Sequence, residues 1–240
     1  MSIRIASLAA IGLLASACHV GADAEERDPG PEVTRTYQVG AFDKVAVAGP
    51  YEINVVTGGQ GGVSAKGGSN LLDETEVIVE DGTLKIKPKK RKGIHWNWHG
   101  GKAVFTVNAA ALHGASIAGS GGINVDKVAG DFDGDVAGSG DLKLASVEGG
   151  AIKLAIAGSG GVDAAGKADS VDISIAGSGD VRAGGLASRT ADVSIAGSGN
   201  VVANASESAD VSIMGSGDVD ISGGAKCSVS KAGSGNVNCH

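Results

Sequence analysis

The sequence predicts an all-β protein: a right-handed parallel β-helix, or β-solenoid, with repeats of about 18–20 residues and a less regular N-terminal β portion. Gly-Ser-Gly recurs seven times at spacings of 18 to 20 residues, with its serines at Ser120, Ser139, Ser159, Ser178, Ser198, Ser216 and Ser234. Apolar and polar residues alternate between these copies, and no helical period is present. A unit of about 19 residues cannot bury its own apolar face, so neighbouring units must stack.

The first 17 residues indicate an export signal, with a positive charge at Arg4, a short apolar core and small residues before a cleavage site. Cys18 follows that site directly, as the acylated cysteine does in bacterial lipoproteins, so we expect lipidation at Cys18. Ala15 stands where such signals usually have leucine, and ordinary cleavage after Ala17 or Ala24 is the alternative. We expect export by a bacterium to the periplasm or outer membrane, with the lipid anchor as the only membrane contact.

Residues 18–35 are polar and contain Pro and Gly, which is typical of a tether. A solenoid domain is expected over residues 36–240. Residues 36–115 alternate in polarity but lack Gly-Ser-Gly, which predicts an irregular β part that forms the first coils or a cap. Within it, Asp81-Gly82 between two alternating runs predicts a hairpin turn.

Three stretches carry a family resemblance: FDKVAVAGPYEINV at 42–55, SNLLDETEVIVEDGTLKI at 69–86, and VNAAALHGASIAGSG at 107–121. They resemble the head GIN domain family (DUF2807), described as heads of autotransporter adhesins. The resemblance runs from about residue 36 to the C-terminus. It implies a β-helical protein exported by a bacterium, often as a lipoprotein, and it transfers no binding residue.

Residues 85–102 contain seven of the 20 basic residues and both tryptophans. The candidate binding residues are Lys89, Lys90, Arg91, Lys92, His95, Trp96, Trp98 and His99. The basic run would attract an anionic envelope glycan or lipid headgroup, which the indoles would stack on or anchor. A protein partner is an alternative, and a metal on two histidines is a weak one. The structural alternative is a solvated hairpin whose tryptophans cover the end of the core.

In the repeats, apolar side chains recur at inward positions that should stack between coils. Those we assign to the core are Val171, Ile173, Ile175, Val193, Ile195, Val211 and Ile213. Glycines beside each turn serine permit positive φ and remove Cβ atoms that would crowd, and we expect the serine hydroxyls to form a ladder. Asp or Asn after five turns tolerates left-handed or Asx geometry; these residues are Asp141, Asp180, Asn200, Asp218 and Asn236.

Cys227 and Cys239 lie in the last repeat, six residues on either side of Gly233 and both at inward positions. In an oxidising compartment they would form a disulfide that clamps the final coil. Two buried free thiols are the alternative.

Charge and spacing argue against several functions. The formal charge of −7 does not suit a nucleic-acid binder. Residues 126–240 hold 15 acidic and eight basic residues, so the molecule is acidic along its repeats and basic near the tether. A phosphate loop needs a strand that leads into a helix, whereas here strand leads to strand. The Asp residues around Asp133 lack the later carboxylate of a calcium loop.

Seven short, similar coils leave no loop long enough to wall a catalytic cleft, and no Ser/His/Asp constellation is present. We therefore predict a non-catalytic binding or structural module of the cell envelope, with no cofactor and no metal. The alternative is a carbohydrate-active enzyme, a polysaccharide lyase or hydrolase, on the same scaffold.

Overall fold

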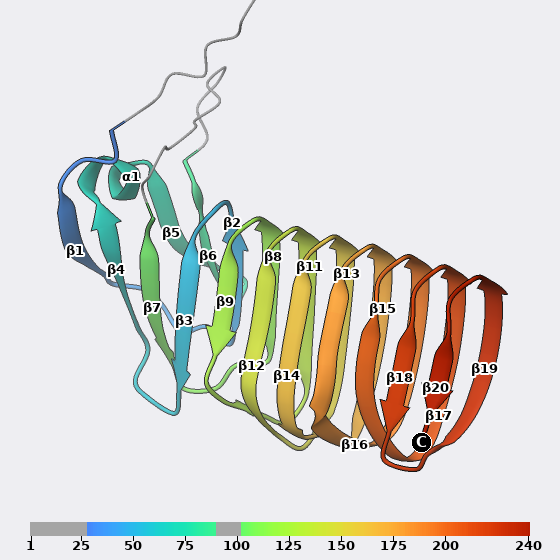
Figure 1. Cartoon of the computed structure of the whole chain (residues 1–240). Coiled ribbons are helices and arrows are strands. Elements are labelled where there is room, and N and C mark those ends of the chain that lie inside the picture. Colours follow the sequence, from blue (N-terminus) through green and yellow to red (C-terminus); the bar gives the residue numbers. More distant parts are fainter. Residues whose placement is uncertain (1–27, 90–101) are drawn as a thin grey trace, which may run out of the picture.

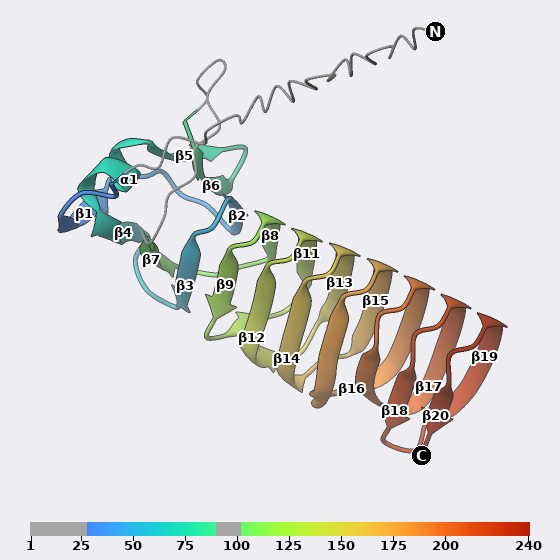
Figure 2. The ribbon, with the colours of Figure 1, turned by 45° about the horizontal axis from the view of Figure 1, so that its top comes forward.

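The computed structural model describes residues 28–89 and 102–240, which form an elongated solenoid of stacked β coils (Figure 1). In each regular coil one strand runs to a Gly-Ser-Gly turn, a second strand runs back, and a corner leads to the next coil. Figure 2 shows the coils as successive layers. The predicted all-β class and solenoid architecture are confirmed.

The strands that precede the turns pair in parallel and form the first sheet. Its regular members are β8 (Gly114–Gly119), β11 (Phe132–Gly138), β13 (Ala151–Gly158), β15 (Ser170–Gly177), the second halves of β16 (Asp180–Gly197) and β17 (Val201–Gly215), and β19 (Lys226–Gly233). The strands that follow the turns form the second sheet. Its regular members are β9 (Gly122–Val125), β12 (Asp141–Glu148), β14 (Gly161–Lys167), the first halves of β16 and β17, β18 (Val219–Ser222) and β20 (Val237–Cys239). At a corner, β10 (Val128–Ala129) pairs with β12.

The core lies between the two sheets and consists of columns of equivalent residues. Ile156, Ile175, Ile195 and Ile213 are partners in successive strands, and each is at most 2 % exposed. All seven residues assigned to the core from the sequence are buried, so that prediction is confirmed. Small aliphatic side chains fill the interior because each one packs on its counterpart in the next layer.

The two glycines of each turn have different roles. The first glycine has a positive φ, between 117° and 140° in the seven turns, which few other residues adopt. The second lies against the preceding coil, where a Cβ would meet backbone. Among the described residues, Asp81 is the only one besides glycine with a positive φ. Of the two geometries expected for Asp and Asn after the turns, left-handed or Asx, the left-handed one is not adopted, because the first glycine of each turn takes the positive φ.

A coil of the same register lies earlier in the chain. β2 (Lys44–Ala48) pairs in parallel with β8, and β3 (Glu52–Thr57) pairs in parallel with β9. Gly49, with φ 112°, takes the place of the first turn glycine. The regular stacking thus reaches into residues 36–115, where Pro50 and Tyr51 replace the usual Ser-Gly.

The remaining N-terminal strands extend and close this end of the solenoid. β6 (Thr83–Pro88) and β7 (Val104–Ala109) stack on β2 and β3. The layer of β6 and β7 therefore lies farther from the regular coils than the layer of β2 and β3, although β2 and β3 come earlier in the chain. Beyond them lie three antiparallel strands and the short helix α1. These are β1 (Glu32–Tyr37), β4 (Gly62–Gly68), β5 (Thr75–Glu80) and α1 (Ser69–Asp73).

The predicted hairpin is confirmed, since β5 pairs antiparallel with β6 through Asp81 and Gly82, both at positive φ. β1 begins at Glu32, inside the segment expected to be a tether.

Tyr51 packs edge-on against Phe105, with ring centroids 5.7 Å apart. None of the helices in residues 28–89 and 102–240 has the length and apolarity needed to cross a membrane.

Candidate binding surface

The outward residues of the first sheet form three parallel columns along the solenoid. Nearest the turns is an apolar column of Ala48, Ala118, Ala137, Ala157, Ala176, Ala196, Met214 and Ala232. Next to it is a mostly small polar column of Ala46, Ser116, Asp135, Ala155, Ser174, Ser194, Ser212 and Ser230. The third column is Lys44, Gly114, Asp133, Lys153, Asp172, Asp192, Asp210 and Ser228. Because most of these side chains are short, the face is flat.

The third column becomes acidic in its second half. Asp172, Asp192 and Asp210 are partners in adjacent strands, so their carboxylates are neighbours. Burial, and then the charges of Asp172 and Asp210, raise the pKa of Asp192 above its ordinary value. This part of the face therefore carries concentrated negative charge.

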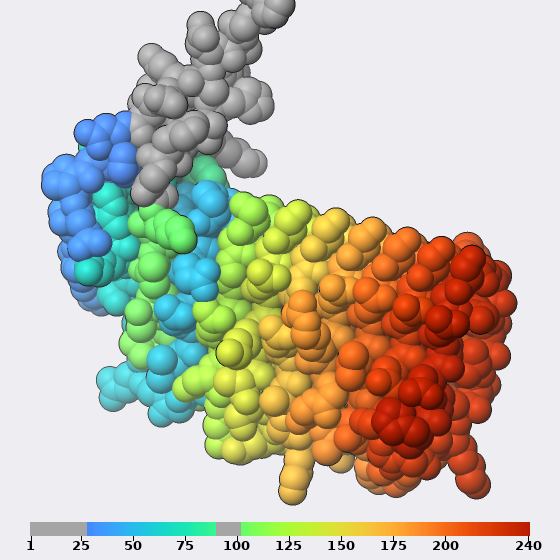
Figure 3. All heavy atoms as spheres, viewed as in Figure 1, coloured from blue at the N-terminus to red at the C-terminus, as the bar shows by residue number. Residues whose placement is uncertain are grey.

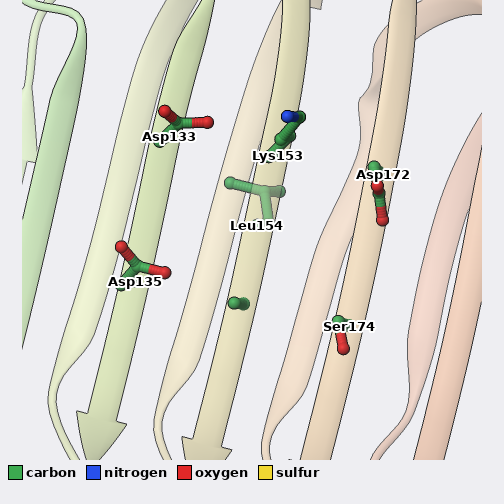
Figure 4. A pocket seen from close by; sticks show the side chains of 7 residues that line it. Asp133, Asp135, Lys153, Leu154, Asp172 and Ser174 are labelled. Atoms are coloured by element: carbon green, nitrogen blue, oxygen red, sulfur yellow. The ribbon is translucent and has the colours of Figure 1, made fainter.

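A shallow depression of about 310 Å³ lies on the same face. Figure 4 shows Asp133 and Asp135 on β11, Lys153 on β13, and Asp172 and Ser174 on β15 around it. Lys153 is the register partner of both Asp133 and Asp172. In the described part of the chain, no group of three or more His, Cys, Asp or Glu side chains is arranged to hold a metal ion.

A second depression, of about 290 Å³, lies at the N-terminal end of this face and is mainly apolar. Its floor includes Ala46, Ala48, Ala118 and Ala137, and the stems of Lys85 and Lys87 line one side. Lys85 forms an ion pair with Glu80 at 2.8 Å, and Lys87 forms one with Glu76 at 3.5 Å. The site is an alanine-floored groove with two paired lysines at its edge.

At the turns, backbone groups join the coils. The backbone N–H of each turn serine from Ser139 to Ser234 donates to the carbonyl oxygen of the first turn glycine in the preceding coil, at 2.8 to 3.0 Å. The turn serines are exposed residues. The residues after the turns form a hydrogen-bonded ladder of their own. The N–H of Asn200 donates to Asp180 Oδ1 at 3.1 Å, that of Asp218 to Asn200 Oδ1 at 3.2 Å, and that of Asn236 to Asp218 Oδ1 at 2.7 Å.

The other candidate residues fall in different places. Cys18 and the residues from Lys90 to His99 lie outside the described part of the chain. Lys89 follows β6, where its N–H donates to the Glu74 carbonyl at 2.8 Å. Cys227 and Cys239 are joined by a disulfide, with Cα atoms 6.6 Å apart.

The alanine, serine and aspartate columns were not expected, although alignment of the repeats on their Gly-Ser-Gly turns reveals them.

These features define a class: a solenoid with a packed interior, shallow depressions and a flat, periodic outer face. In the view of Figure 3 the coloured coils form a closed surface without a deep cleft. The model of the head GIN domain, "Putative auto-transporter adhesin", matches residues 41–225. The chain belongs to this family.

Several solved structures share this fold. A "putative adhesin" from Bacteroides fragilis NCTC 9343 is 26% identical, with a TM-score of 0.80 over 88% of this chain and 97% of its own. A "putative lipid binding protein" from Parabacteroides distasonis ATCC 8503 is also 26% identical, with a TM-score of 0.72 over the same shares. A "putative adhesin" from Parabacteroides merdae ATCC 43184 is 20% identical, covers 88% of this chain and 97% of its own, and shares the fold at a TM-score of 0.68. No functionally curated protein shows significant similarity to the chain.

Proposed function

We propose that this protein is a non-catalytic binding module of the bacterial cell envelope, exported and held at the membrane by a lipid on Cys18. The observation that carries this proposal is the packed interior beneath a flat, repetitive face. The family's adhesin label and the adhesin neighbours support the same reading.

Flatness also favours binding over catalysis. Carboxylate-based hydrolysis depends on two groups fixed on either side of a bound bond, within a cleft that positions the substrate. The depression around Asp133 and Asp172 lies on an open sheet face. The carbohydrate-active enzyme is therefore the less favoured function.

We propose an anionic envelope glycan as the ligand, bound at the basic segment Lys89–Lys92. The solenoid repeats are acidic, so an anion would approach the end of the molecule where the basic residues are concentrated. Such binding should weaken as salt increases.

The test compares two variants that each lose four positive charges. The first variant replaces with Ser the four basic residues Lys89, Lys90, Arg91 and Lys92. The second variant replaces with Ser four lysines of the repeats: Lys143, Lys153, Lys167 and Lys226. Binding to a panel of anionic envelope polysaccharides should be lost in the first variant and retained in the second. New reducing ends or unsaturated products during incubation would contradict a non-catalytic role.

Lipid binding is a second candidate, favoured by the apolar groove on β2, β6, β8 and β11. Its alanine floor could contact an acyl chain while Lys85 and Lys87 lie near a headgroup. Ala118→Glu should then abolish co-sedimentation with phosphatidylglycerol vesicles. Ala196→Glu, in the same column but outside the groove, should leave it unchanged. Equal co-sedimentation of both variants would rule out the groove.

A further inference from the structure

The last coil, formed by β19 and β20, differs from the others at its inward positions. In the core column that contains Ile175, Ile195 and Ile213, β19 has Lys231. Val229, the register partner of buried Val211, is 49% exposed. An apolar residue at position 231 would continue the core to its open end, and the sequence places a charge there instead.

Lys231 also satisfies a backbone acceptor at this end. Its Nζ donates to the carbonyl oxygen of Gly235, the second glycine of the last turn, at 2.7 Å. At three earlier turns the equivalent carbonyls, of Gly121, Gly140 and Gly160, accept N–H groups from the next coil at 3.1 to 3.2 Å. The ammonium group of Lys231 therefore donates the hydrogen bond that, at those three turns, comes from a backbone N–H of the next coil.

The disulfide links the two sheets within the same coil. Cys227 is the register partner of buried Ala209, and Cys239 is the register partner of buried Ile221. The covalent bond thus joins β19 to β20 at two core columns. It holds the coil closed where no further layer packs on it in the described structure.

The outer edges of β19 and β20 have no pairing strand among the described residues. Such edges are templates for strand addition. A second copy of the chain presents the same two edges, and a twofold axis would place them antiparallel to one another. At the opposite end, the antiparallel strands and α1 already cover the stack.

We propose that Lys231 and the Cys227–Cys239 disulfide form an end cap that prevents a second copy of the chain from stacking on the last coil. Two Lys231 side chains would meet at the twofold seam, where each would lose water without gaining an opposite charge. The disulfide keeps β19 and β20 from opening to accept new partners.

The test removes both parts of the cap in the full chain. Lys231→Ile with Cys227→Ser and Cys239→Ser should lower the dimer dissociation constant by about a hundredfold or more, as measured by light scattering across protein concentrations. Hydrogen exchange should show new protection in β19 and β20 of the dimer. Lys226→Ile, on the same strand but facing outward, should remain as monomeric as the unaltered protein.

Circular dichroism shows whether the triple variant is folded. A folded triple variant that stays monomeric would overturn the proposal, and so would an unaltered protein that already associates through this end. Where the triple variant does not fold, Lys231→Met in the oxidised protein replaces it. That variant should dimerise more tightly than Lys231→Arg; equal behaviour of the two would also overturn the proposal.

Discussion

Gly179 is packed directly against Gly160 of the preceding coil. A Cβ on Gly179 would lie 2.5 Å from the Gly160 carbonyl oxygen and 2.6 Å from Ile156 Cγ2. The φ of Gly179 is outside the left-handed region, so the obstacle to a side chain is steric. The requirement for glycine at this position comes from the stacking of one turn on another.

Gly179→Ala is therefore expected to destabilise the protein by about 1–3 kcal/mol, because the turn would have to move away from the coil beneath it. Urea unfolding followed by circular dichroism measures this loss. Gly62→Ala is the control, since a Cβ there meets nothing within 4 Å and should change stability by less than about 0.5 kcal/mol. Equal effects of the two substitutions would mean that the turns do not stack as described.

The inward assignment of the repeats is tested by a charge in the core. Ile175→Asp or Ile195→Asp should unfold the protein, because an unpaired carboxylate would replace a side chain that is 1–2 % exposed. Ala176→Asp, at the adjacent outward and exposed position, should leave the fold intact. Thermal melts of all three variants check this, and an unchanged melting temperature for Ile175→Asp would contradict the assignment.

Local pattern was sufficient to predict the regular part of this fold. The alternation around Ile173 and Ile175 fixes which side chains point inward, and Asp81-Gly82 fixes a hairpin. The order of the layers was not predictable in this way. β6 and β7 lie outside β2 and β3, and this depends on long-range pairing that no local period encodes.

Two features were not predictable from a single repeat. Coils were expected in residues 36–115, but Pro50 and Tyr51 in place of Ser-Gly hide that β2 and β3 form a coil in regular register, with AGPYEINV at 48–55 aligned on AGSGGINV at 118–125. The hydrogen-bonded ladder through Asp180 and Asn200 is not visible in the sequence of a single turn, because each of its bonds joins two coils. Its partners lie in neighbouring coils, about 19 residues away in sequence.

Asp192 predicts a pH dependence of stability. Burial, and then Asp172 and Asp210, raise its pKa in the folded protein, whereas the unfolded value is about 3.9. Ionisation of Asp192 therefore opposes folding above the folded pKa, and this opposition disappears as the pH falls through that pKa toward the unfolded value. Near neutral pH, Asp192→Asn should melt at a higher temperature than the unaltered protein. At pH about 3, where Asp192 is protonated, the two melting temperatures should be the same.

Asp135→Asn is the comparison for Asp192, because the register partners of Asp135 are Ser116 and Ala155 and carry no charge. Its melting temperature should change less with the same substitution. A gain for Asp192→Asn that persists in acid would point to a cause other than charge.

The ladder after the turns depends on the alternation of Asp and Asn. Asp180 Oδ1 accepts hydrogen bonds from both the N–H and the Nδ2 of Asn200, at 3.1 and 3.0 Å. Asn200→Asp would remove one donor and place a third carboxylate between Asp180 and Asp218. We expect a loss of about 1–2 kcal/mol at neutral pH, most of which returns in acid. Asn200→Gly, which removes the side chain without adding charge, should show no recovery in acid.

Reduction of the disulfide should loosen the last coil alone. Cys227 and Cys239 are separated by 12 residues, and a bridge across a loop of this length contributes about 3 kcal/mol by restricting the unfolded chain. Because β19 and β20 receive packing from one side only, that contribution acts locally. Hydrogen exchange in residues 226–240 should therefore accelerate in reductant, while β13 and β14, which have coils on both sides, keep their protection. Uniform acceleration along the chain would instead mean that the solenoid unfolds as a single unit and that its end has no stability of its own.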